Sequence, residues 1–128
     1  MSRLKQAVAA AALGNAGITE EGAAFGRYLF PADFVGFEGH FPGYPVLPAI
    51  VQVLAALDVA GRIEAAVLRL TKMDKAKFHV RIRPHQEIRV ECRKILRSEE
   101  TAWHCSVFAD GELASSFRLS CVSVEEEP

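Results

Sequence analysis

Residues 48 to 64 form an apolar segment that is too long for one β-strand and has no continuous polar face. Its apolar side chains are Ile50, Val51, Val53, Leu54, Ala55, Ala56, Leu57, Val59, Ala60 and Ile63. A helix that is hydrophobic on every face is buried on every face. Pro48 stands at its start, where proline is tolerated because the first helical amide has no partner within the helix. The sequence therefore predicts a fully buried helix from Pro48 to about Glu64.

After this helix the hydrophobic period changes to two, which is typical of half-buried strands. The alternating apolar positions are Phe78, Val80 and Ile82, then Ile88, Val90 and Cys92, then Trp103, Cys105 and Val107, and finally Leu113, Phe117, Leu119 and Cys121. Residues 24–30 have the composition of a short earlier strand. Asp110-Gly111 predicts a two-residue hairpin, and residues 83–86 and 98–100 predict two further turns.

A single antiparallel sheet wrapped around the central helix satisfies both patterns, which predicts an α+β architecture. The sheet would cover one side of the helix and leave its far side short of cover, so we expect a homodimer. We expect one domain over residues 1–128, with an alanine-rich helix ending near Gly14 and a loop within residues 1–22, and a frayed acidic tail over 124–128.

Composition excludes several classes of protein. The net charge of −1 gives no field that would attract nucleic acid. No apolar run reaches the roughly 18–20 residues of a membrane span. Cys92, Cys105 and Cys121 lack the spacing of a metal site, so we expect buried free thiols, no bound metal and a cytoplasmic location.

Residues 39–48 read GHFPGYPVLP and place three prolines after His40. Prolines fix φ and remove amide donors, so this segment cannot be regular structure. It predicts a rigid connector that holds one titratable ring at the entrance of the buried helix.

Two segments resemble the hotdog-fold 3-hydroxyacyl-acyl-carrier-protein dehydratases of fatty-acid synthesis. The first is GHFPGYPVLP, which is similar to the family signature HFPGxP followed by two apolar residues, proline and glycine. The second runs from MDKAKF at residue 73 to RPHQEI, which ends at residue 88. With the hairpins that follow, the resemblance covers roughly residues 24 to 123. It implies a homodimeric hotdog fold, and the N-terminal part is closer to small dehydratase-like members of specialised acyl or polyene pathways.

The chain departs from the family pattern at three positions. The family has an acidic residue in the helix, fourteen positions after the histidine, where this chain has Leu54. The glycine at the helix start is Ala49, and the turn glycine after Pro84 is His85.

The resemblance implies roles for individual residues. His40 would take the α-proton of the acyl thioester, since a histidine near neutral pKa suits a general base. The Ala49 amide would hold the thioester oxygen at the helix N-terminus. Gly43 would let the backbone turn beside the substrate, and Pro48, Leu54 and Phe78 would line the substrate site. No cofactor is implied beyond the phosphopantetheine of an acyl carrier protein.

Asp58 lies one helical turn beyond Leu54 on nearly the same face. It is our candidate for the missing acid, contributed across a dimer and assisted by a bridging water. The alternative is a local ion pair with Arg62, four residues further on.

Lys75, Lys77, Arg81 and Arg83 occupy alternate positions, together with His79. On one strand they would share a face and could dock an acidic acyl carrier protein and its phosphate. The alternative is a solvated face that discourages edge pairing.

Three functions fit these observations. The first is a dehydratase-like enzyme acting on 3-hydroxyacyl-carrier-protein thioesters in fatty-acid or related acyl or polyene synthesis. The second is a non-catalytic acyl-binding subunit, favoured by Leu54, in a homodimer, a heterodimer or a higher oligomer. The third is a hotdog thioesterase, which would need an acid or a hydroxyl beside the helix start.

Overall fold

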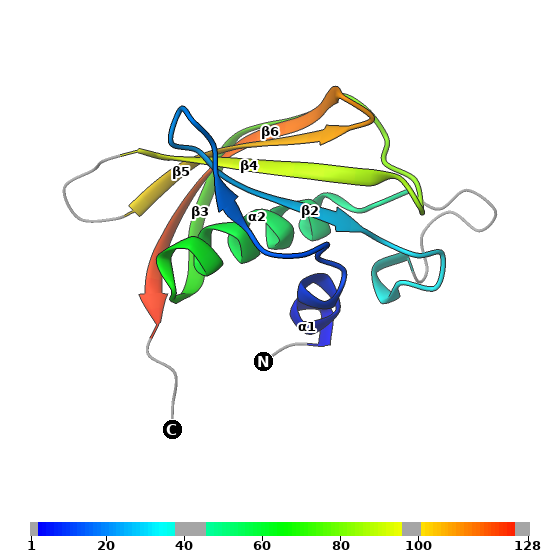
Figure 1. Ribbon diagram of the computed structural model, residues 1–128, viewed down its shortest axis with the longest axis horizontal. Coiled ribbons are helices and arrows are strands. Elements are labelled where there is room, and N and C mark those ends of the chain that lie inside the picture. Colours follow the sequence, from blue (N-terminus) through cyan, green and yellow to red (C-terminus); the bar gives the residue numbers. More distant parts are fainter. Residues whose placement is uncertain (1–2, 38–45, 96–100, 125–128) are drawn as a thin grey trace.

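The computed structural model describes residues 3–37, 46–95 and 101–124. Its elements are α1 (Arg3–Ala10), β1 (Gly17–Ile18), β2 (Ala24–Leu29), the 3-10 turn η1 (Val35–Phe37), α2 (Ala49–Glu64), β3 (Val67–Phe78), β4 (Glu87–Ile95), β5 (Thr101–Ala109) and β6 (Glu112–Val124). The strands form one six-stranded sheet in the order β1-β2-β4-β5-β6-β3, and every neighbouring pair is antiparallel. The sheet curves over α2, and α1 lies on the far side of α2 from the sheet (Figure 1).

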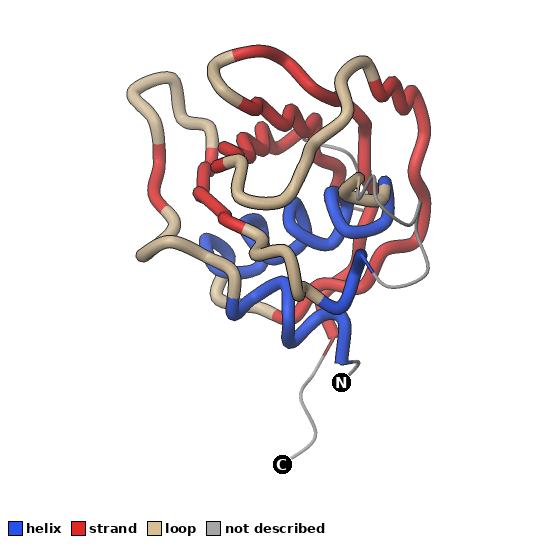
Figure 2. Tube along the Cα trace, turned by 90° about the vertical axis from the view of Figure 1, so that its right-hand side faces the viewer, coloured by secondary structure: helices blue, strands red, loops and turns tan. Residues whose placement is uncertain are grey.

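The core lies between the concave face of the sheet and α2. The alternate residues of the three central strands point into it, among them Val90, Cys105 and Phe117, each with no exposed surface. Figure 2 shows the strands surrounding α2, while α1 packs along α2 from below. The three cysteines are buried free thiols, as the sequence predicted. In the part of the chain described, no helix is long and apolar enough to cross a membrane.

Helix α2 begins and ends within one residue of the predicted segment. Pro48 is its N-cap, with extended φ and ψ of −64° and 153°, and Ala65 ends it in the left-handed conformation with φ 53°. The prediction that the helix is buried on every face is wrong for the single chain. A stripe at four-residue spacing is exposed or half-buried, because the sheet and α1 cover it only in part; it consists of Ile50, Leu54, Asp58 and Arg62.

The predicted hairpin at Asp110-Gly111 is confirmed. Both residues have positive φ, 52° and 79°, which is the type I′ geometry that matches the twist of the flanking strands. The turn at residues 83–86 is also present, with the Gln86 amide donating to the Arg83 carbonyl. His85 has φ 65° there, a conformation that glycine adopts without cost. The turn predicted at residues 98–100 lies outside the described residues.

The alternation of Phe78, Val80 and Ile82 was interpreted as a strand, and this was wrong. The strand is β3, which ends at Phe78. Residue 78 pairs with Ser115, close to the start of β6, and the amides of His79 and Val80 both donate to the Ala114 carbonyl. The chain then leaves the sheet, because β6 offers few further partners.

Candidate active site

The two segments that carry the family resemblance meet in space. The Leu47 amide donates to the Ile82 carbonyl at 2.7 Å. This bond joins the end of the proline-rich segment to the loop that follows β3. His40 and Gly43, the predicted base and turn glycine, lie outside the described residues. The structure therefore describes the end of the first segment and the helix that follows it.

The start of α2 presents backbone donors. The Val51 and Gln52 amides donate to the Pro48 carbonyl at 3.1 and 3.3 Å. Among the described residues, no backbone carbonyl accepts from the amides of Ala49 or Ile50, and both residues are exposed. The first amides of a helix and the helix dipole together favour a partial negative charge at this position. Backbone donors of this kind stabilise an oxygen on which negative charge develops.

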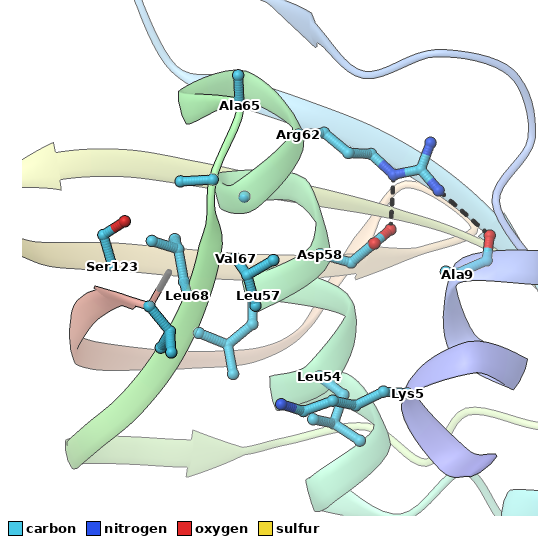
Figure 3. Close-up of a pocket in the computed structure, with 13 residues that line it drawn as sticks. Lys5, Ala9, Leu54, Leu57, Asp58, Arg62, Ala65, Val67, Leu68 and Ser123 are labelled. Atoms are coloured by element: carbon cyan, nitrogen blue, oxygen red, sulfur yellow. Dashed lines mark hydrogen bonds and ion pairs between the residues drawn. The ribbon is translucent and has the colours of Figure 1, made fainter. Parts of the chain in front are cut away.

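A pocket of about 700 Å³ opens along the other half of the same helix face. Leu54, Leu57, Gly61, Ala66, Leu68 and Val124 give it a mainly apolar wall, and Lys5, Asp58 and Arg62 give it charged positions. Figure 3 shows Leu54 beside Lys5 of α1 and Asp58 further along α2. The pocket thus brings together Leu54 and Asp58, two residues predicted to belong to the site.

Asp58 is held by two donors on one oxygen. Its Oδ2 accepts from the Tyr28 hydroxyl at 2.5 Å and from Arg62 Nε at 2.9 Å. Arg62 also donates to the Ala9 carbonyl at 3.3 Å, which ties α1 to α2 (Figure 3). The local ion pair expected from the sequence as the alternative is therefore present. Among the described residues, no hydrogen bond reaches Oδ1.

Tyr28 is a site residue that sequence reasoning missed. Burial raises the pKa of its phenol well above its ordinary value, and the hydrogen bond to Asp58 and the charge of that residue raise it further. Tyr28 therefore keeps its proton and donates it in the hydrogen bond to Asp58. A tyrosine within a predicted strand gave no signal of this partner, because the contact spans thirty residues of sequence.

Phe78, Lys75 and Lys77 lie on β3 at the edge of the sheet. The Phe78 ring is partly exposed and stacks on Phe117, with centroids 6.2 Å apart. The basic residues do not share one strand face, which corrects the prediction. Lys75 has φ 52°, and the pairing with β6 shifts register between residues 74 and 77. The other two, Arg81 and Arg83, lie beyond the strand, although all four are exposed.

Within residues 3–37, 46–95 and 101–124 no group of three or more histidine, cysteine or acidic side chains is arranged to hold a metal ion. The described part of the candidate site offers backbone donors, one anchored carboxylate and an apolar pocket.

Comparisons with known proteins identify similar dehydratases. The family profile of ApeI-like proteins, described as ApeI dehydratase, matches residues 18–118. The curated 3-hydroxyacyl-[acyl-carrier-protein] dehydratase FabZ of Geotalea uraniireducens is 31% identical over 101 residues, which cover 70% of this chain and 69% of that protein. FabZ of Ralstonia nicotianae is 28% identical over 103 residues, 71% of this chain and 62% of that protein. The chain spans about two thirds of the length of these relatives.

Solved structures share the fold. A chain of the dehydratase heterocomplex ApeI:P from Xenorhabdus doucetiae superposes with a TM-score of 0.64 at 17% identity, covering 77% of this chain and 86% of that one. An uncharacterized protein from Erwinia carotovora superposes with a TM-score of 0.66 at 21% identity, covering 90% and 97%. The hotdog fold expected from the sequence is thereby confirmed.

Proposed function

The chain belongs to the ApeI-like dehydratase family, and on that basis we propose that it removes water from 3-hydroxyacyl thioesters carried by an acyl carrier protein. The proposal rests above all on the start of α2. Among the described residues, no backbone carbonyl accepts from the Ala49 and Ile50 amides, and these amides follow directly after the Leu47–Ile82 hydrogen bond that joins the two family segments. It is strengthened by the dehydratase relatives, which match about 70% of the chain.

His40 is the proposed base. It would take the proton from C2 of the substrate, and the electron pair released would form the C2–C3 double bond as the C3 hydroxyl leaves. Negative charge builds on the thioester oxygen during this step, and the Ala49 amide would stabilise it. Alanine retains the N–H that this role needs. Gly43, Pro48, Leu54 and Phe78 are the proposed substrate neighbours.

The leaving hydroxyl needs a proton to depart as water, and Asp58 is the proposed donor. It is the carboxylate of the pocket, four residues along the helix from Leu54. It would act through Oδ1, since Oδ2 accepts from Tyr28 and Arg62. His40 would return the C2 proton to Asp58 through water, which restores the site. A proton on Asp58 would weaken its ion pair with Arg62.

The test is to incubate the protein with 3-hydroxyacyl-carrier protein of several acyl lengths and to follow the 2-enoyl thioester by mass. Wild type should form the product, and Asp58→Asn should lose at least about a hundredfold in rate, the lower end of what a general acid contributes. Arg62→Met is the matched control, because it removes a partner of Asp58 but keeps the carboxyl group. An unchanged rate in Asp58→Asn would remove the acid assignment and leave the reaction in place.

The ion pair of Asp58 also favours a second function. Leu54 stands where the family has its acid, and Asp58 is bound by an ion pair. A non-catalytic subunit that binds acyl thioesters would retain the helix start and the pocket without turnover. Measurable binding of acyl-carrier protein, together with no product at any acyl length, would select this function.

We propose that a second copy of the chain covers the exposed stripe of α2. Ile50 is 52% exposed in the single chain, an unusual position for a large apolar residue at a helix start. The neighbouring β3 leaves one edge of the sheet unpaired. Sedimentation should show a dimer that Ile50→Glu weakens. A monomer that assembles only with a second hotdog subunit would instead match the heterocomplex named for the Xenorhabdus protein.

Lys75, Lys77, Arg81 and Arg83 are the proposed docking residues for the carrier protein. They differ in backbone setting but together give the end of β3 and the following loop a positive surface. Such a surface would attract an acidic partner and its phosphate, with binding that weakens as salt rises. Lys77→Glu should lower carrier-protein affinity, whereas Lys72→Glu, earlier on the same strand, is the control.

A further inference from the structure

Gln52 and Ser115 are buried polar residues in the core. They bond to each other, with Ser115 Oγ donating to Gln52 Oε1 at 2.6 Å. Gln52 Nε2 donates in turn to the Leu47 carbonyl at 3.3 Å. Burying polar groups costs free energy unless they are paired, and an apolar pair of similar shape would avoid this cost. The pair therefore needs an explanation beyond packing.

The carbonyl that Gln52 binds belongs to the last residue before the helix cap. Leu47 is thus fixed through both of its backbone groups, because its amide donates to Ile82. Ser115 lies on β6 directly opposite Phe78. One glutamine side chain therefore connects the end of the proline-rich segment, the first turn of α2 and the strand beside Phe78.

The Leu47 carbonyl has a direct effect on the helix start. Pro48 has no N–H and makes no side-chain cap, but its carbonyl shares a peptide plane with the Ala49 N–H and accepts from the Val51 and Gln52 amides. These bonds set the direction of the Ala49 N–H relative to the helix, and the restraint on Leu47 keeps this first turn from fraying. Gln52 holds Leu47 from the carbonyl side, and Ile82 holds it from the amide side.

We propose that Gln52 is a positioning residue that orients the Ala49 amide toward the reacting thioester oxygen by holding the Leu47 carbonyl. It acts through Leu47 and does not contact the substrate. The inference rests on the function proposed above, and it adds Gln52 to the residues on which that reaction depends. The hydrogen bond to Leu47 also sets which way the Gln52 amide group faces. The flipped amide would place Oε1 against the Leu47 carbonyl oxygen, and two acceptors cannot form a hydrogen bond.

The test compares four variants with wild type. Gln52→Met keeps the volume but removes the bond to Leu47 and leaves the Ser115 hydroxyl unpaired. Gln52→Met with Ser115→Ala removes that second defect and should recover part of the lost melting temperature. Ser115→Ala alone keeps the bond to Leu47. Leu119→Ala, at a buried position further along β6, is the control for lost stability.

If Gln52 positions the amide, kcat should fall at least about tenfold in Gln52→Met with KM changed less than about twofold, since the thioester oxygen gains its charge only in the transition state. The double variant should keep this low kcat although its stability recovers. Ser115→Ala should lose less activity than Gln52→Met, and Leu119→Ala should keep its kcat at temperatures where it is folded. A kcat that returns with the melting temperature in the double variant would overturn the inference.

Hydrogen exchange separates this inference from the proposed function. The Leu47 amide should exchange at least about tenfold faster in Gln52→Met than in Leu119→Ala at equal distance from the melting temperature. Equal exchange in the two variants would refute the bond to Leu47 as a restraint, whether or not the protein turns over substrate. If wild type forms no enoyl product, the proposed function fails, and hydrogen exchange alone decides whether Gln52 holds the helix start.

Discussion

Replacing Tyr28 by phenylalanine removes one oxygen atom from the cluster of Tyr28, Asp58 and Arg62 and tests how much its hydrogen bond stabilises the fold. The variant keeps the buried ring and removes the hydroxyl that donates to Asp58 Oδ2 at 2.5 Å. A hydrogen bond to a charged group contributes about 1.5–3 kcal/mol, and the Tyr28 side chain is fully buried. At about 2.1 cal/mol/K per residue, the 128 residues unfold with an entropy of about 0.27 kcal/mol/K. The loss should therefore lower Tm by about 6–11 °C.

Arg62→Met is the matched control, because Arg62 donates to the same oxygen from a more exposed position. Its side chain is 36% exposed, so solvent screens the ion pair, which should contribute less than about 1 kcal/mol. Arg62→Met should lower Tm by less than about 4 °C, and part of this effect should disappear in high salt.

The pH dependence of stability tests the contribution of Tyr28 independently. The pKa of Tyr28 is raised in the folded protein, whereas the unfolded phenol ionises near pH 10. The contribution of Tyr28 is therefore fully present below about pH 10 and is lost as pH rises above it. The stability gap between wild type and Tyr28→Phe should shrink by up to about 1.4 kcal/mol per pH unit above that value.

Urea unfolding from about pH 8 to about pH 11, in steps of about one-half pH unit, measures the free energy of unfolding of wild type and both variants. The reasoning would be refuted by a stability loss in Tyr28→Phe no larger than that of Arg62→Met, together with a gap that stays constant above about pH 10.

Two further predictions concern stability alone. Hydrogen bonds from Arg118 lower the pKa of Asp74 from 3.8 to about 2, so their contribution to stability is present above about pH 4 and is lost as pH falls toward 2. In acid unfolding, the difference in stability between wild type and Arg118→Met should therefore close over that range. A constant difference would contradict this prediction. Gly61→Ala should lower Tm by about 4 °C, because the added Cβ would lie 2.8 Å from the Ala66 carbonyl oxygen. The resulting strain, about 1–3 kcal/mol, exceeds the gain in helix propensity, about 1 kcal/mol. Thermal unfolding measures this change, and a raised Tm would show that the backbone shifts to relieve the contact.

The helix and the hairpin were the most predictable parts of the fold. Residues 49–64 fill the interior of a curved sheet, and a segment with that role has to be apolar over most of its surface. Asp110-Gly111 was equally clear because both residues must adopt positive φ, which few residue types tolerate.

The loop after β3 shows where periodicity fails. Ile82 is buried without pairing in the sheet, and alternation reports burial and not hydrogen bonding. The first part of β3 was missed for the opposite reason. It is an edge strand with many exposed side chains, so it shows no clear alternation.

The candidate site was predictable only in part. The sequence placed Leu54 and Asp58 on one helix face, and the pocket confirms that they share it. Tyr28 could not be found, since its bond to Asp58 depends on how β2 crosses α2. Gln52 gave a usable signal, because it is the single amide side chain in a mainly apolar helix. Its partners on the chain before the helix and on β6 could be identified only from the structure.

The measurement that bears most directly on the proposed function is dehydration of 3-hydroxyacyl-carrier protein by wild type and His40→Ala at equal concentrations of folded protein. We expect enoyl product with wild type and a loss of at least about a hundredfold with His40→Ala, because a general base contributes about 10²–10⁴-fold. Equal binding of the carrier protein by both would show that the loss is chemical. A rate unaffected by His40→Ala would contradict the proposed function.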